Sequence, residues 1–160
     1  MKNKIRLTIY IFVSGFFLLL DQVLKYFARV NSEFSFYIWK KYLGWEYFEN
    51  SGVAFSLPFP NWLIIIITPI ILLGLLYFLT KKKRPFGVSS GRVQSIFYLG
   101  IFLIFAGAIS NFVDRVLFCV TIDYLRVLTG VINLADVMIV VGAGIVLIDS
   151  YLRQKEDLVS

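Results

Sequence analysis

The sequence predicts an all-α integral membrane protein, a single domain over residues 1–160 with four transmembrane helices and a small β-sheet on its outer face. Hydrophobic residues make up 59% of the chain, whereas soluble domains contain roughly 45–50%. Four apolar runs are each long enough to cross a bilayer. Ten of the sixteen basic residues lie before the first run, between the second and third, or after the fourth, as the positive-inside rule requires.

The first apolar run extends from Leu7 to Tyr26. A helix over this run is about 30 Å long, which matches the hydrocarbon core of a bilayer. Because basic residues precede it, a cleaved signal peptide is the alternative. The run is long and no small-x-small cleavage site follows it, so we expect a retained helix.

The second run covers Trp62 to Thr80 and contains Pro69 and Gly74, both of which membrane helices tolerate. The third run covers about 93–111 and the fourth about 133–151. We expect Gly142 and Gly144 in the fourth run to permit close helix packing. Asp149, near the inner end of that run, is expected at the membrane interface.

Both termini and the loop 81–92 are therefore predicted to be cytoplasmic, and the segments 27–61 and 112–132 to face outward. The basic cluster at 81–84 is interpreted as a topology anchor rather than a nucleic-acid site. Segment 27–61 is too long for a plain connector, and its partial alternation with many aromatics indicates short strands. Two roles for these aromatics remain open, a general interfacial belt and a cradle for substrate.

The chain contains no histidine and a single cysteine, Cys119. These counts exclude a histidine-based triad, a zinc site built from cysteine or histidine, and an intrachain disulfide. Without a histidine to activate it, Cys119 is expected to behave as a small hydrophobic residue. No cofactor or metal is predicted.

The polar residues that look out of place in this apolar chain map to one depth, near the outer surface. Helical rise places Asp21 about 21 Å along the first span, and Lys25 lies one turn further out. The remaining residues lie at the outer ends of spans or in the outer segments; they are Asn50, Asn111, Asp114, Asp123 and Asp136. Their convergence indicates a site at the outer membrane surface.

Purely structural roles are the alternative. Asp21 and Lys25 have the i,i+4 spacing of an ion pair within one helix. Asp114 and Arg115 are candidates for a surface pair.

Asn133 is a candidate N-cap, with Asp136 offering a carboxylate to the same helix end. Capping explains Asp136 only in part, because serine or threonine at the cap would do the job without a charge.

One hydrolytic chemistry fits a histidine-free cluster of carboxylates. Two aspartates a few ångströms apart cannot both ionise, so one stays protonated while the other acts as a base. The base deprotonates a water that attacks a carbonyl, and the protonated partner polarises that carbonyl. This is peptide hydrolysis of the aspartyl type, on substrates that arrive laterally through the bilayer.

Five motifs, in order along nearly the whole chain, resemble those of the lipoprotein signal peptidases, the bacterial signal peptidase II family. They are Asp21-Gln22 with Lys25, Asn50-Ser51-Gly52-Val53-Ala54-Phe55, Asn111-Phe112-Val113-Asp114-Arg115, Thr121-Ile122-Asp123-Tyr124-Leu125 and Asn133-Leu134-Ala135-Asp136. A single Asn-x-x-Asp is weak evidence, whereas five motifs in order on four spans are strong evidence.

The resemblance implies an aspartyl endopeptidase of the bacterial cytoplasmic membrane in which Asp123 and Asp136 are the catalytic dyad. Such an enzyme removes signal peptides from diacylglyceryl-modified prolipoproteins, cleaves before the lipidated cysteine, and needs no metal or cofactor. By the same resemblance, the partners are these substrates and membrane lipids, and nucleic acid is not a partner. The predicted sheet would form a β-cradle on the outer face. The supporting and substrate-binding residues would be Asp21, Lys25, Asn50, Gly52, Asn111, Asp114, Arg115 and Asn133.

The chain departs from the family pattern near both halves of the site. Ala106 and Ser110 stand where the family has glycines, and each adds a side chain to an expected helix contact. The stretch from Asp123 to Asp136 is shorter than usual, although it is still long enough to bring both carboxylates together, and Ile132 replaces an aromatic residue. A paralogue with narrowed activity is therefore an alternative to a fully active enzyme.

Two other functions compete with the peptidase. In a proton- or ion-coupled transporter, intramembrane carboxylates would carry the ion, but here they cluster at one surface instead of forming a chain across the bilayer. A non-catalytic lipoprotein-binding paralogue would not need both Asp123 and Asp136. Activity on a lipidated precursor separates the three.

Overall fold

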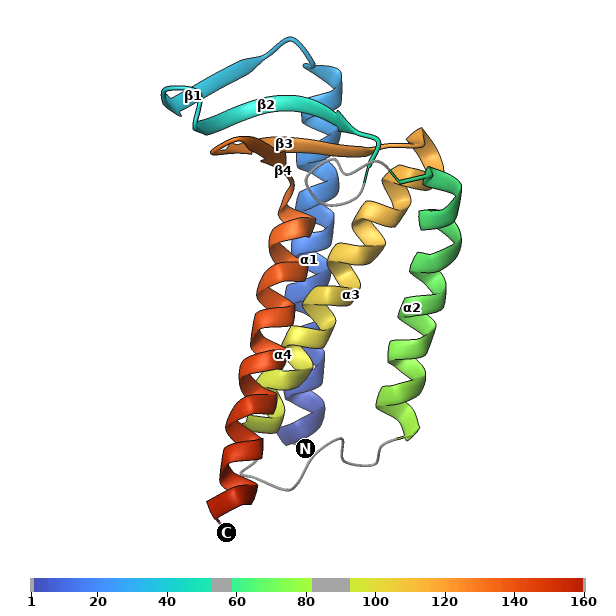
Figure 1. Cartoon of the computed structure of the whole chain (residues 1–160), viewed down its shortest axis with the longest axis vertical. Coiled ribbons are helices and arrows are strands. Elements are labelled where there is room, and N and C mark those ends of the chain that lie inside the picture. Colours follow the sequence, from blue (N-terminus) through green and yellow to red (C-terminus); the bar gives the residue numbers. More distant parts are fainter. Residues whose placement is uncertain (1, 53–58, 82–92, 160) are drawn as a thin grey trace.

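The computed structural model describes residues 2–52, 59–81 and 93–159. Within them, four helices run along one axis and a four-stranded antiparallel sheet lies across one end of the helices (Figure 1). Both ends of the chain lie at the opposite end (Figure 1). In chain order the elements are α1 (Lys2–Val30), β1 (Ser35–Trp39), β2 (Leu43–Asn50), α2 (Asn61–Lys81), α3 (Val93–Phe118), β3 (Thr121–Val127), β4 (Gly130–Ile132) and α4 (Leu134–Val159).

The helices have an apolar exterior, as expected for a protein dissolved in lipid. Phe12 on α1 is 75% exposed and Val140 on α4 is 70% exposed. Three described stretches are long and apolar enough to cross a membrane, namely Ile5–Val30, Ile96–Phe118 and Leu134–Leu152, and α2 has a shorter one, Asn61–Tyr77. The predicted helices therefore form, and three of them meet this criterion for a span.

α3 is longer than the sequence indicates, because the expected end near Asn111 is followed by seven further helical residues. The charges of Asp114 and Arg115 suggested a surface there. Both side chains are instead buried, with partners on other elements, so the expectation of a surface pair is wrong. The helix ends before Cys119, whose backbone is left-handed (φ 62°).

The sheet has the order β1-β2-β3-β4. The predicted strands of the aromatic segment form the β1–β2 hairpin, and β2 then pairs with β3, which comes from the segment between α3 and α4. This pairing places Phe48 opposite Asp123 and Asn50 opposite Thr121. The register thus carries the end of β2 to the carboxylate of β3.

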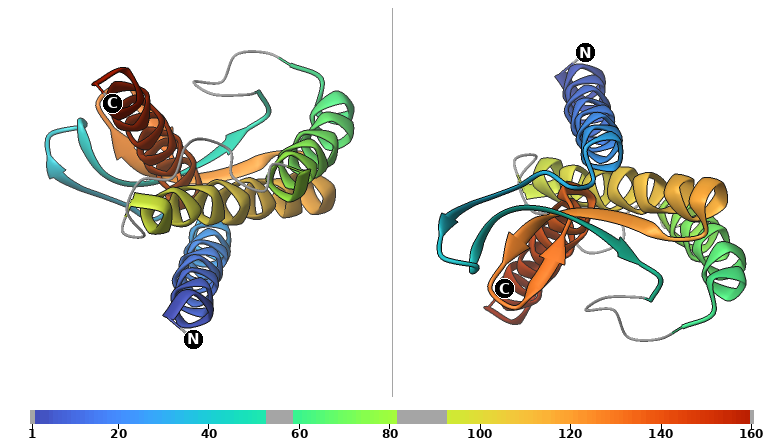
Figure 2. Two further views of the ribbon diagram at one scale, coloured as in Figure 1. Left: turned by 90° about the horizontal axis from the view of Figure 1, so that it is seen from below. Right: turned by 90° about the horizontal axis from the view of Figure 1, so that it is seen from above.

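Two buried clusters hold the sheet and the helices together. One lies where α1 meets β3 and contains Ala28, Ile122 and Tyr124. The other lies between α3 and α4 and includes Ala106 and Met138. Viewed along the helices, α3 lies between α1 and α4, and α2 stands beside the end of α3 that meets the sheet (Figure 2).

α3 and α4 cross closely at two glycine positions. A Cβ added at Gly142 would lie 2.5 Å from the carbonyl oxygen of Gly100, and one at Gly107 would lie 2.5 Å from that of Ala135. The packing role expected for Gly142 is confirmed. It is wrong for Gly144, where an added Cβ would have nothing within 4 Å. Asp149 is buried within the protein, and its position at the membrane interface stays a prediction.

We expect Gly142→Ala to destabilise the protein by about 1–3 kcal/mol, because overpacking pushes two backbones apart. Thermal unfolding of the purified protein, followed by the loss of monodisperse material in detergent, measures this. Gly144→Ala is the matched control, two residues away on the same helix. Equal unfolding temperatures for both variants would contradict the close crossing.

Candidate active site

The ten residues singled out in the sequence come together where α1, α3 and the start of α4 meet the sheet. Each of them makes at least one hydrogen bond or ion pair to another of the ten. They are Asp21, Lys25, Asn50, Gly52, Asn111, Asp114, Arg115, Asp123, Asn133 and Asp136. Positions 53–55 of the second motif lie outside the described residues.

Asn133 and Asp136 cap the start of α4 by hydrogen bonds to each other. The backbone N–H of Asp136 donates to Asn133 Oδ1 at 2.8 Å, and the backbone N–H of Asn133 donates to Asp136 Oδ2 at 3.4 Å. This reciprocal capping confirms the predicted N-cap. The other carboxylate oxygen, Asp136 Oδ1, accepts from Asn111 Nδ2 at 2.8 Å, so the carboxylate does more than cap its own helix.

Asp123 lies on β3 and is fully buried. Its Oδ1 accepts from Asn133 Nδ2 at 2.6 Å, and its Oδ2 accepts from Asn50 Nδ2 at 3.0 Å. Burial is the main cause that raises the pKa of Asp123 to about 7, and the negative charge of Asp136 is the second cause. At neutral pH this carboxyl therefore exists in both protonation states.

Asn133 joins the two carboxylates directly. Its side-chain amide nitrogen binds Asp123, while its amide oxygen and its backbone N–H bind Asp136. The same side-chain nitrogen also reaches Asn111 Oδ1 at 3.1 Å. Two asparagines thus hold the two acids as one unit.

A buried ion cluster supports this unit from α1. Lys25 Nζ lies 2.9 Å from carboxylate oxygens of both Asp21 and Asp114. It also donates to Asn111 Oδ1 at 2.8 Å, which connects the cluster to Asp136. The i,i+4 pair expected between Asp21 and Lys25 is present, but it belongs to this larger cluster.

Ser110, at a position where the family has glycine, takes part in the cluster. Its fully buried hydroxyl donates to Asp21 Oδ2 at 2.6 Å and accepts from Gln22 Nε2 at 2.8 Å. The added side chain therefore bonds to α1. The close approach of α3 to α4 is kept one turn earlier, at Gly107.

Asp114 has partners on two other elements. It pairs with Lys25 on α1 and accepts the backbone N–H of Ile122 at 3.1 Å. This second bond ties β3 to α3 one residue before Asp123. Asp114 thus lies behind β3 and holds the strand.

Arg115 contacts both sides of the segment that joins β2 to α2. Its guanidinium donates to the carbonyl of Gly52 and, at 3.3 Å, to Asn61 Oδ1. The Gly52 amide in turn donates to Asn50 Oδ1 at 3.0 Å. Arg115 thereby holds in place the asparagine that binds Asp123.

Four members of this network were not singled out as site residues, namely Gln22, Asn61, Ser110 and Tyr124. Gln22 and Tyr124 stand inside the quoted motifs, and Ser110 was noted only as a replaced glycine. These four side chains are neutral, so they do not stand out in an apolar sequence as charged residues do. A tyrosine directly after Asp123, on the opposite face of a strand, was the available signal.

Comparison with known proteins places the chain among membrane peptidases. The family described as "Signal peptidase (SPase) II" matches residues 13–152. The lipoprotein signal peptidase of Lactococcus lactis subsp. cremoris (strain MG1363) is 32% identical over 156 residues, covering 94% of this chain and 96% of that protein. That of Halothermothrix orenii is 34% identical over 143 residues, covering 87% of this chain and 91% of that protein.

The fold has a solved counterpart. A structure described as a bacterial membrane enzyme, determined by the in meso method at 2.3 Å resolution, is similar with a TM-score of 0.79 at 26% identity. The similarity covers 94% of this chain and 91% of that chain. Since the family match extends over most of the sequence and both the relatives and the fold agree with it, this chain belongs to the signal peptidase II family.

Proposed function

We propose that this protein removes signal peptides from diacylglyceryl-modified prolipoproteins, cutting before the lipidated cysteine, and that Asp123 and Asp136 perform the hydrolysis. One observation carries the proposal: Asn133 holds two carboxylates together, the buried one of Asp123 on β3 and the half-buried one of Asp136 in the first turn of α4. Such a pair keeps one proton between two acids. That is the state an aspartyl peptidase requires.

In this mechanism Asp123 carries the shared proton and Asp136 is the base. Asp136 takes a proton from water as the water oxygen bonds to the scissile carbonyl carbon, and Asp123 gives its proton to the carbonyl oxygen. When the carbon–nitrogen bond breaks, Asp136 returns its proton to the leaving nitrogen. The hydroxyl of the intermediate returns a proton to Asp123, so both acids regain their starting states.

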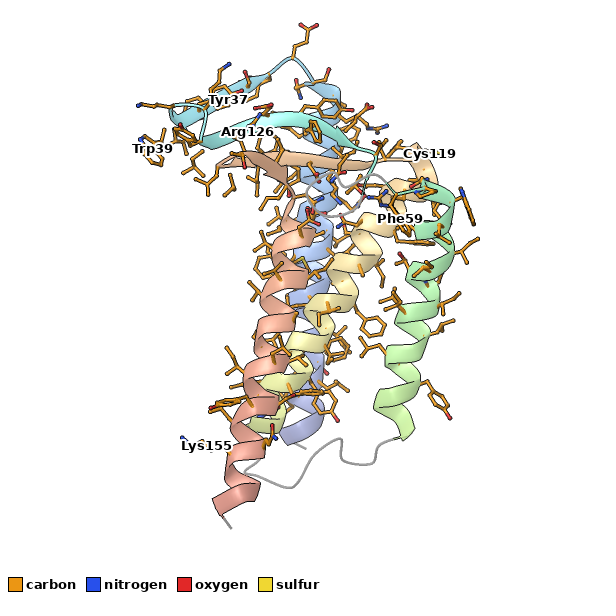
Figure 3. The ribbon with its side chains drawn as sticks, in the orientation of Figure 1. Tyr37, Trp39, Phe59, Cys119, Arg126 and Lys155 are labelled. Atoms are coloured by element: carbon orange, nitrogen blue, oxygen red, sulfur yellow. The ribbon has the colours of Figure 1, made fainter. Side chains whose placement is uncertain are left out.

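A membrane arrangement is part of the same proposal. α2 has 21 residues, a length of about 31 Å at the usual helical rise, so we assign all four helices as spans. The sheet then lies at the outer face, with Trp39 at the free end of the β1–β2 hairpin (Figure 3) as an interfacial anchor. Both termini are cytoplasmic, and substrate held by its acyl chains presents its peptide bond at the depth of the dyad.

Cys119 provides a test of this orientation without any mutation. It is the one cysteine of the chain, it is exposed, and it lies at the sheet end of the helices (Figure 3). An impermeant thiol reagent should label it in intact cells. A Cys119→Ser, Gln154→Cys variant, whose thiol lies at the other end, should be labelled only after permeabilisation. The reverse pattern would invert the assigned topology.

The function itself is tested on a purified precursor that exists with and without its diacylglyceryl group. We expect the reconstituted protein to shorten the lipidated form by its signal peptide, and to cut the unlipidated form at least about 100-fold more slowly, because the acyl chains place the peptide bond. Mass spectrometry of the product identifies the cut. No cleavage by folded protein would favour the non-catalytic, lipoprotein-binding alternative.

The pKa of Asp123 predicts a pH dependence. The mechanism needs this carboxyl protonated, so kcat/KM should fall as pH rises through about 7, by about tenfold for each further pH unit. Initial rates from about pH 5 to about pH 9 at constant ionic strength measure the alkaline limb. A rate that stays constant across the alkaline range would assign the shared proton elsewhere.

A further inference from the structure

The first three backbone N–H groups of α4 are bound by three different parts of the chain. Leu134 N–H donates to the hydroxyl of Tyr124 at 3.1 Å, and Ala135 N–H donates to Asp21 Oδ1 at 3.2 Å. The third, on Asp136, is bound by Asn133 within the cap. Helix starts are commonly capped by their own flanking residues. Here β3 and α1 supply two of the three acceptors.

Tyr124, like Asp21, connects all three elements. Its hydroxyl accepts from Leu134 and donates to Asp21 Oδ1 at 2.8 Å. The ring is fully buried and stacks on Trp45 with centroids 4.8 Å apart. Burial and the negative charge of Asp21 raise the pKa of Tyr124, so the phenol stays neutral and keeps the proton with which it binds Asp21.

The position of Tyr124 in the strand makes this connection relevant to the site. Side chains alternate along a strand, so Asp123 points to one face of β3 and Tyr124 points to the other. On one face of β3, Asp123 presents its carboxylate to the site. On the opposite face, Tyr124 anchors α4, the helix that presents the carboxylate of Asp136. A shift of the Tyr124 contact would change the separation between Asp123 and Asp136.

We infer that the hydroxyl of Tyr124 is a positioning group that sets the distance between the two aspartates, by fixing the first turn of α4 to β3 and α1. This inference rests on the proposed function, because it concerns the geometry of the same dyad. Tyr124 touches neither acid through a hydrogen bond that the structure records. It acts through Leu134 and Asp21.

The test is Tyr124→Phe, which keeps the stacked ring and removes only the hydroxyl. Displacements of about 1 Å at a catalytic pair cost up to about 100-fold in rate, so we expect kcat to fall about 10–100-fold with KM within about twofold of the original. Tyr47→Phe is the matched control, because its hydroxyl bonds to Glu49 on β2 away from the dyad. The control should keep the original kcat.

A second readout separates positioning from simple loss of stability. Asp123 faces charges from Asp136 on α4, Lys25 on α1 and Arg115 on α3. If the start of α4 moves away, the repulsion from Asp136 weakens and the alkaline limb of the pH profile should move to lower pH. Hydrogen exchange of the amides in 134–136 should also become faster in Tyr124→Phe and not in Tyr47→Phe.

The possible outcomes separate this inference from a packing role for Tyr124 and from the proposed function. A lower unfolding temperature with unchanged kcat and pH profile per folded molecule would overturn it and leave Tyr124 a packing residue. If Tyr124→Phe does not fold, Leu134→Pro removes the same hydrogen bond from the other side at a position where proline is tolerated, and must show the same pH shift. If the unsubstituted protein cleaves no precursor, the proposed function has failed, whereas an active protein with an unaffected Tyr124→Phe defeats this inference alone.

Discussion

Asp123→Asn and Asp136→Asn should each lower turnover by about 10²–10⁴-fold or more, which is the usual contribution of a general acid or base. Asparagine keeps the size of the side chain, and its oxygen can still accept from one of the two N–H groups that donate to each carboxylate, so the fold should survive. It cannot take up or release the proton that hydrolysis moves. The measurement is the initial rate of precursor cleavage per molecule of monodisperse protein extracted from the membrane.

Two further exchanges of the same type calibrate this result. Asp114→Asn should lose less activity, because Asp114 holds Lys25 and the backbone of Ile122 rather than the other aspartate. Asp149→Asn, at the far end of α4, should leave the rate near that of the original protein. Near-normal turnover in either dyad variant would show that the dyad is wrong and would make Asp114 the next candidate.

Lys25→Met should abolish accumulation of folded protein. The lysine is only 2% exposed and lies 2.9 Å from two buried carboxylates. Removing one partner from a buried ion pair costs about 3–5 kcal/mol, because it leaves charge uncompensated, and a domain is stable by only about 5–15 kcal/mol. Two carboxylates lose their partner here, so the cost approaches the whole stability.

The control for this variant is Lys41→Met in the exposed β1–β2 turn, which should accumulate normally. Quantitative blotting of the membrane fraction, with size-exclusion chromatography in detergent, distinguishes absent from misfolded protein. Adding Asp114→Asn to Lys25→Met removes one of the stranded charges and should restore part of the folded yield. A fully folded, monodisperse Lys25→Met protein would show that the buried cluster is not needed for stability.

The sequence predicted the helices well because an apolar run of bilayer length has few alternatives. It missed the end of α3, since Asp114 and Arg115 resemble the start of a water-exposed loop until their partners on α1 and before α2 are known. It also treated Gly142 and Gly144 alike. Which of two nearby glycines faces a neighbouring helix depends on the rotation of α4, and this rotation is set by packing.

The site was predictable to the extent that charge is unusual in an apolar chain. All ten residues singled out for their charge or motif lie in one network. Tyr124 and Ser110 were missed, because a tyrosine or a serine is ordinary in a membrane helix or strand. Only the three-dimensional arrangement shows that their hydroxyls complete the hydrogen bonding of Asp21.

The bond between Ala135 and Asp21 joins positions 114 residues apart, on the last helix and the first. During synthesis, therefore, α1 enters the membrane long before the backbone N–H of Ala135, which binds the carboxylate of Asp21, has been made. A nascent or truncated chain that lacks α4 holds Asp21, Lys25 and Asp114 in lipid without Asp136. Such a chain should be inactive toward the precursors made beside it and open to degradation, so that the ability to cut peptide bonds arises only once α4 has been made.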